Sequence, residues 1–340
     1  MEHRKLTRYL ISLMMILIMV GLAEWTNEKE ILFPEMTALI IGLLIIDKRV
    51  WNVKRWQIIL LMTLGAVAGI CIVRYSPLPY VVNLCAAFVF AGASLLISRA
   101  TLIPLISACV LPVLLHTESI IYPIAVFSMS VSVVLVQIIL EKCGIRNRMP
   151  KSVGRKPGKE DIIRWLILFC FVGALTGLAV SMDYPYLILP PLMVTFVEMV
   201  NSKAGFKNRP TQVFLFLTTV ATLGTVLQIV GHHHLHLPES IIALTIAAIL
   251  FLIFEWTGKY FAPAGALAFI PMLLPQEGLG WLPLEASIGA ALFITIAMVV
   301  FQKCYKWNRA QLIFCATPTL LREYMNRKKR KNKSNKLRTR

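Results

Sequence analysis

The chain has 340 residues, of which 57% are hydrophobic and only 15% are charged, and its mean hydropathy is +0.72. A soluble domain needs far more polar surface than this, so the composition excludes the soluble classes and predicts an integral membrane protein with several spans. The formal net charge is +18, and basic residues gather in segment 141–161 and after Asn326. Beside membrane spans, such clusters are typical of the cytoplasmic face and of contact with anionic lipid, not nucleic acid.

The chain opens with MEHRKLTRYLISLMMILIMVGLAEW, which has the charged start and apolar middle of a signal peptide. It lacks a clean small-x-small cleavage site, and many apolar segments follow, so we interpret it as a retained first span. The seven cysteines form no paired-spacing motif, which predicts neither disulfides nor a metal site.

Twelve apolar segments follow one another, each long enough to cross the bilayer or to form a short, tilted or broken membrane helix. We therefore predict an all-α polytopic protein of the cell membrane. The predicted segments are 9–25, 31–46, 56–73, 78–97, 102–115, 120–140, 162–180, 185–200, 211–230, 238–256, 262–275 and 284–302.

Loop charge predicts the orientation of these segments. Lysine and arginine lie before the first segment and after every even-numbered one, whereas loops such as NEKE, SPLPY and HTES carry almost none. The positive-inside rule then predicts that both termini are cytoplasmic. If 102–115 and 262–275 re-enter the membrane instead of crossing it, ten crossings remain and the two halves of the chain would be inverted.

An internal duplication is the next prediction. The pattern P-x7-P begins at Pro104 and again at Pro263, and TLG begins at Thr63 and again at Thr222, both at an offset of 159 residues. Three further blocks recur in the same order. Two tandem repeats of about six segments each are a common transporter architecture, with the substrate site near the midplane between them. The predicted domains are repeat 1–140, basic linker 141–161, repeat 162–305 and basic tail 306–340.

Each predicted repeat contains a proline-led helix, FPEMTALIIG in the first and LPPLMVTFVEMVN in the second. An acid in hydrocarbon is costly, so Glu198 either faces a cavity, a partner or a proton path, or lies solvated at the cytoplasmic interface beside Lys203. The first repeat has Gly42 near this position and carries its acid at Glu35. Helical spacing places the candidate residues of the second helix on one stripe: Pro190, Pro191, Thr195, Glu198 and Asn201.

Each repeat also contains a short apolar segment, which is APAGALAFIPMLLP in the second repeat. Pro263 favours a helix start with free amide groups, which is a weak anion site, and Lys259 lies four residues earlier. Arg99 precedes Pro104 in the first repeat by five residues. We expect the two short helices to face each other near the midplane, with these cations forming an electropositive vestibule.

Small residues in this segment, Gly265 among them, would let a substrate approach the backbone closely. On this interpretation Gly265→Leu blocks the path and leaves the bundle folded. The alternative is that the small residues serve only helix packing and the nearby cations only set topology.

No soluble catalytic or nucleotide-binding motif occurs in the sequence, which predicts a protein that is not an enzyme and needs no cofactor. The histidines at 232, 233, 234 and 236 lie in a predicted outer loop. Adjacent histidines cannot all point at one ion, so a pH-sensitive or merely polar loop is favoured over a metal site. We expect Glu255 to form a local helix pair with Lys259.

The region from Leu189 to about Phe301 resembles the HPP family of integral membrane proteins. The resemblance rests on LPPLMVTFVEMVN, SKAGFKNRPTQV and FAPAGALAFIPMLLPQEGLGW. The His-Pro-Pro motif of that family falls on Phe261-Ala262-Pro263, where only the last proline is kept. Some relatives in that family are linked to nitrite transport, so the resemblance implies transport of a small anion.

These observations together predict a transporter or channel for a small solute or ion, with a small anion as one candidate and a homo-oligomer as one possible state. The alternative is a non-transporting membrane subunit or scaffold of an envelope complex that docks through its basic tail.

The loop charges generate a topological prediction. A reporter fused after Arg340, or inserted within 150–158, should read cytoplasmic in whole cells. A periplasmic or extracellular reading at either site would overturn the predicted orientation.

Overall fold

The computed structural model describes residues 2–149, 154, 157–201 and 210–304, and over these residues all regular structure is helical. Eight helices in this part of the chain are long enough and apolar enough to cross a membrane, which confirms the helical multi-pass class predicted from composition. They are α1 (Glu2–Thr26), α3 (Arg55–Tyr75), α4 (Tyr80–Ser98), α6 (Ile121–Lys142), α7 (Lys159–Ser181), α9 (Pro210–Leu227), α10 (Glu239–Thr257) and α13 (Leu282–Cys304).

Four shorter helices lie between the long ones. Proline sets their starts, since its missing N–H costs nothing in the first turn of a helix. α2 and α8 begin at a proline, Pro263 lies in the first turn of α11, and Pro104 caps α5. The four are α2 (Pro34–Ile40), which continues as the π-helical η2 (Ile41–Ile45), α5 (Leu105–Leu114), α8 (Pro190–Asn201) and α11 (Ala262–Phe269), which continues as the 3-10 turn η6 (Ile270–Met272).

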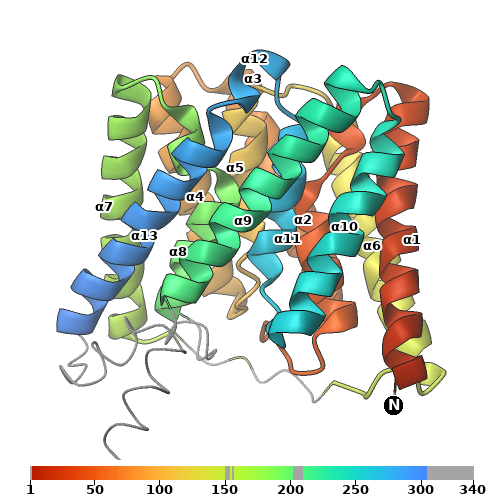
Figure 1. The fold of residues 1–340 in the computed structure, drawn as a ribbon. Helices are drawn as coiled ribbons and strands as arrows, with labels where there is room; N and C mark the ends of the chain where they lie inside the picture. The colour runs from red at the N-terminus through yellow and green to blue at the C-terminus, as the bar shows by residue number, and fades with distance from the viewer. Residues whose placement is uncertain (1, 150–153, 155–156, 202–209, 305–340) are drawn as a thin grey trace, which may run out of the picture.

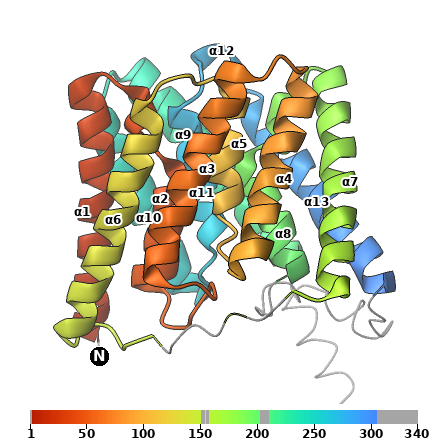
Figure 2. The same cartoon turned by 180° about the vertical axis from the view of Figure 1, so that it is seen from behind.

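The short helices form the centre of the bundle, and the long helices surround them (Figures 1 and 2). Every residue of α2, η2, α5 and α11 is buried, and so is α8 from Pro190 to Met199. The long helices instead expose one apolar side, as a lipid-facing surface requires. The remaining elements are η1 (Lys29–Ile31), η3 (Pro185–Ile188), η5 (Gln228–His234) and α12 (Gln276–Leu279).

The chain crosses the bundle in each short segment and does not turn back. Figure 2 shows α4 ending at the edge where the N-terminus lies, whereas α6 begins at the opposite edge, so α5 and the residues before it complete a crossing. In the same way α10 ends at the N-terminal edge and α12 lies at the far edge, so α11 also crosses (Figure 1). The alternative in which 102–115 and 262–275 re-enter, which would invert the halves, is therefore wrong.

Each of α5 and α11 packs against a proline-led helix from the other half of the chain. The main partners of α11 are α2 and α9, and those of α5 are α3, α4 and α8. We expected α5 and α11 to face each other near the midplane, but α2 and α8 take those positions. The reason is that residues such as Gly265 let α2 approach α11 closely, so this pair makes the tighter interface.

The first helix is fastened to α10 at both ends. Near the N-terminal edge, Lys5 Nζ lies 2.9 Å from Glu255 Oε2, and the hydroxyls of Tyr9 and Tyr260 donate to Glu255 Oε1. At the far edge, the Glu24 carboxylate accepts hydrogen bonds from the first backbone N–H groups of α10. Glu255 therefore pairs with α1, and the expected local pair with Lys259 is not formed.

Glycines allow the central helices to touch the long ones. A Cβ built on Gly69 of α3 would lie 2.5 Å from the carbonyl oxygen of Cys109 in α5. A Cβ on Gly224 of α9 would meet the carbonyl oxygen of Ala268 in α11 and lie 3.2 Å from Pro271 Cγ. Both positions have backbone in the way, which cannot move as a flexible side chain could.

This packing predicts that Gly224→Ala destabilises the bundle by about 1–3 kcal/mol, the usual cost of overpacking a tight interface. The matched control is Gly177→Ala in α7, where a new Cβ meets nothing within 4 Å. That change should be neutral or stabilising by about 0.5–1 kcal/mol through helix propensity. Thermal unfolding of both variants in one detergent measures the difference, and equal midpoints would refute the assigned contact.

Candidate functional site

A buried acid lies in the first turn of α2. Glu35 is 1% exposed, and its Oε1 accepts a hydrogen bond from Ser107 Oγ of α5. Its Oε2 is buried and has no hydrogen-bond partner, and no described basic residue forms an ion pair with it. An acid with so few partners in a membrane interior is costly to keep, which marks the position as a functional candidate.

Two aromatic side chains, Phe33 before α2 and Tyr122 of α6, lie near Glu35. The Tyr122 ring meets the Phe33 ring edge-on at 5.9 Å between centroids, and the Tyr122 hydroxyl donates to the carbonyl oxygen of Ala108 at 3.1 Å. Phe33 is the residue directly before α2, and both rings are buried. Glu35 is therefore enclosed by α2, α5 and α6 in this conformation.

A second buried acid lies in α8. Glu198 is 3% exposed, and its Oε1 accepts a hydrogen bond of 3.0 Å from the indole Nε1 of Trp51. Trp51 comes from the segment between η2 and α3, and its ring occupies the space where a side chain on Gly42 would be. The burial of Glu198 contradicts the solvated, interfacial alternative, and Lys203 lies outside the described residues.

The other four residues predicted to share a face of α8 make contacts within the helix or near its two ends. Pro190 and Pro191 form the first turn of α8, as predicted. The Thr195 hydroxyl donates to the carbonyl oxygen of Pro191, one helical turn earlier, at 2.8 Å. Asn201 Oδ1 accepts from Arg164 at 3.4 Å. Among the five stripe residues, Glu198 is the one that the structure gives a buried polar contact with another part of the bundle.

The two cations that were predicted to form a vestibule, Lys259 and Arg99, lie in different surroundings. Lys259 Nζ donates to Gln212 Oε1 of α9 at 2.7 Å, which is a contact between the α10–α11 connection and α9. Arg99 is exposed and ends α4 in a left-handed conformation with φ 55°. Pro104 and Pro263 start their helices as expected, whereas Lys259 contacts α9 and Arg99 is exposed at the end of α4.

Gly265 belongs to a helix interface. A Cβ on this residue would collide with Ile41 Cδ1 and lie 3.1 Å from Thr37 Cγ2, both on the α2–η2 segment. The expectation that Gly265→Leu blocks a path and leaves the bundle folded is therefore wrong, because the leucine would push α2 and α11 apart. The alternative interpretation of the small residues, that they serve packing, is the one that this contact supports.

The histidine run ends α9 as part of η5. His232 Nδ1 lies 3.2 Å from the carbonyl oxygen of Leu237, and His232 Nε2 lies 3.7 Å from Glu239 Oε1. Over the described residues, no group of three or more histidine, cysteine or acidic side chains is arranged to hold a metal ion.

Sequence reasoning did not find Ser107, Trp51 or Tyr122. Ser107 is the one hydroxyl in the apolar helix Leu105–Leu114, and this isolation is the only feature that could have marked it. Trp51 lies in a basic loop, where a tryptophan is usually interpreted as an anchor at the membrane interface. No family model, curated protein or solved structure matches this chain.

The Trp51–Glu198 contact predicts a coupled pair. Trp51→Phe should destabilise the fold by roughly 1–3 kcal/mol, because Glu198 stays buried and loses its donor. The same change in a Glu198→Gln background should cost less, since a neutral amide is cheaper to leave without this donor. Thermal unfolding of the two single variants and the double variant measures the coupling.

Trp56→Phe is the matched control, because Trp56 is 58% exposed and lies only five residues further along the chain. It should leave the midpoint unchanged. Additive effects of Trp51→Phe and Glu198→Gln would show that the indole and the carboxylate do not depend on each other.

Proposed function

We propose that this protein is a membrane transporter or channel for a small solute, and that its path runs between two tandem repeats through the central short helices. The observation that carries the proposal is a pair of buried carboxyl groups, Glu35 and Glu198, on two of those helices. A protein that only anchors or scaffolds has no need to keep acids in a hydrocarbon interior, where they are expensive. Acids so placed are typical of ion and proton pathways.

The short helices support this proposal through their geometry. Helices that begin or end inside the bundle leave free backbone groups near the midplane, which is where transporters with broken helices bind ions and substrates. α2, α5, α8 and α11 are all too short to span a membrane, and they contact one another across the two halves of the chain. In the described conformation they are tightly packed, as in an occluded state.

The packing pattern supports the repeat relation. α3 packs against α4, α5 and α6, and α9 packs in the same order against α10, α11 and α13. Two contacts between the halves also match each other. α1, the first helix of the first half, packs against α10 of the second half, and α7, the first helix of the second half, packs against α4 of the first half. Because the segments cross in the same sense in both halves, the repeats we propose are parallel, related by an axis along the membrane normal.

One correspondence between residues supports the same relation. Arg8 donates to the carbonyl oxygen of Ile45, and Arg164 donates to Asn201 Oδ1; an offset of 156 residues relates both donors and both acceptors.

The proposal predicts flux in proteoliposomes that contain the full-length protein. Potassium nitrite is the first probe anion, because of the HPP resemblance, with formate and chloride beside it. Glu35→Gln and Glu198→Gln should each lower the flux by about tenfold or more, which corresponds to a barrier increase of ~1.4 kcal/mol. Glu277→Gln is the control, since Glu277 is exposed in α12 and should leave the flux unchanged.

Thermal unfolding of each variant separates loss of function from loss of fold. Flux that stays at wild-type level in both buried variants would remove these acids from the path. Absence of flux above empty vesicles for every probe, together with stable co-purification of a membrane partner, would favour the alternative of a non-transporting subunit.

A further inference from the structure

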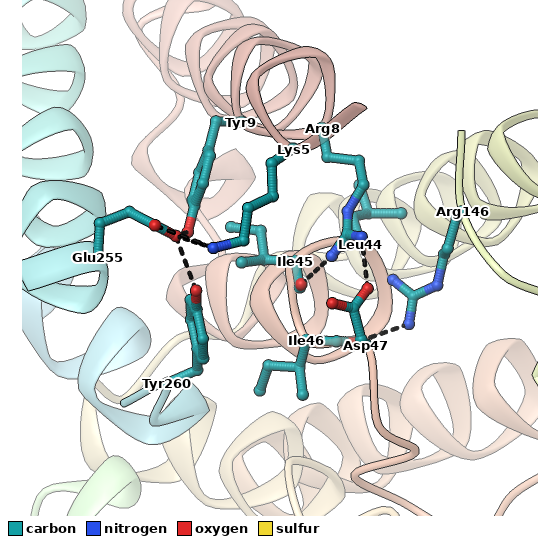
Figure 3. A network of polar contacts seen from close by, with 10 residues as sticks. All are labelled: Lys5, Arg8, Tyr9, Leu44, Ile45, Ile46, Asp47, Arg146, Glu255 and Tyr260. Carbon is teal, nitrogen blue, oxygen red and sulfur yellow. Dashed lines mark hydrogen bonds and ion pairs between the residues drawn. The ribbon is translucent and has the colours of Figure 1, made fainter. Parts of the chain in front are cut away.

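Two buried arginines meet at the end of the α2–η2 segment, close to the N-terminal edge of the bundle (Figure 3). Arg8 of α1 is 6% exposed and donates through Nε to the carbonyl oxygen of Leu44 at 2.8 Å. It also donates to the carbonyl oxygen of Ile45 and, through Nη1, to the Asp47 carboxylate at 2.5 Å. All hydrogen-bonding nitrogens of Arg8 therefore have partners.

The second arginine is less well satisfied. Arg146 follows α6, is 3% exposed, and donates through Nη2 to the carbonyl oxygen of Ile46 at 2.8 Å. Its Nε and Nη1 are buried and have no hydrogen-bond partner. Burial, and next the charge of Arg8, lower the pKa of Arg146 to about 10. Two guanidinium groups thus lie close together, and one of them has donors to spare.

The negative charge at this cluster does not match the positive charge. Asp47 lies between the two guanidinium groups in Figure 3 and is the one acid bonded to either of them in the described part of the chain. The next acid, Glu141, already pairs with Arg55 and accepts from Gln137. Buried charge that is not matched is costly, and the carbonyl end of η2 offsets only part of it.

We propose that Arg8 and Arg146 form a binding site for a phosphate-type oxyanion, either a phosphate monoester headgroup of a membrane lipid or free inorganic phosphate. A dianion matches two guanidinium groups where a single carboxylate does not, and arginine suits phosphate because of its planar set of donors. Basic pockets between helices at a membrane surface are a recurrent form of headgroup site.

Asp47 acts in this site as an internal anion that the ligand displaces. Its side chain is 58% exposed and belongs to the segment after η2, so it can turn into solvent without moving a helix. When it turns away, Arg8 Nη1 loses its partner and, together with Arg146 Nε and Nη1, can donate to an oxyanion. The site does not depend on transport, so it stands or falls separately from the proposed function.

The test is thermal unfolding of the full-length protein in neutral detergent, titrated with inorganic phosphate against chloride at constant ionic strength. A second arm adds phosphatidic acid or phosphatidylcholine to the micelles. Phosphate or phosphatidic acid should raise the midpoint. Asp47→Asn should lower the midpoint without ligand and bind the effective ligand about fivefold tighter, the size of one exposed ion pair. A response to phosphatidic acid alone identifies a headgroup site, and a response to phosphate identifies the free ion.

Arg146→Gln should abolish the stabilisation, whereas Arg148→Gln should keep it, because Arg148 is exposed two residues further on and the charge change is identical. Equal responses in these two variants would overturn the proposal and leave only general attraction between charges. No response in wild type and Asp47→Asn would also overturn it, and the arginines would then serve only to cap η2. If Arg146→Gln does not fold, the response of Asp47→Asn to ligand still tests the proposal.

Discussion

The interior of a bilayer contains no water, so every backbone group at the end of a short helix must find its partner within the protein. This constraint governs the bundle, because four of its helices are too short to span. Their burial behind eight long helices, complete except for the last two residues of α8, is the condition under which they can exist at all. The carbonyl end of η2 illustrates this requirement, since three successive carbonyl groups there accept hydrogen bonds from Arg8 of α1 and from Arg146, which follows α6.

The two buried acids meet the same constraint in different ways. Glu35 uses a hydroxyl from a neighbouring short helix, and Glu198 uses an indole from a loop. Under the proposed repeat relation, Gly42 occupies the place of Glu198 in the first half. The missing side chain there makes room for the Trp51 ring, whose N–H then reaches the acid of the second half. The asymmetry of the repeats thus supplies a contact that two identical halves could not make.

Much of the architecture could be predicted from the sequence, because hydrophobicity and proline act locally. All twelve apolar segments correspond to helices, and the starts of α2 and α8 lie at the prolines that predicted them. Helix ends were less accurate: α1 begins seven residues before the predicted span, since its charged first turns continue the helix beyond the apolar run.

The candidate site was only partly predictable, for a physical reason. An acid in an apolar run is visible in a sequence, and both Glu35 and Glu198 were found that way. Their partners lie 72 and 147 residues away, and no local pattern links them. The role of the small residues in α11 was predicted wrongly for the same reason. The sequence does not show whether the space beside a glycine holds a ligand or another helix. Here it holds Thr37 and Ile41.

The double attachment of α1 to α10 has a consequence for how the protein is made. Lys5 and its partner Glu255 are separated by 250 residues. At ~5–20 residues per second, the ribosome needs on the order of 10–50 s to synthesise that length. During this interval α1 resides in the membrane with charged and polar groups at both ends and without its final neighbour. The nascent first half must therefore remain open along one side, and the late arrival of α10 closes the bundle around its core.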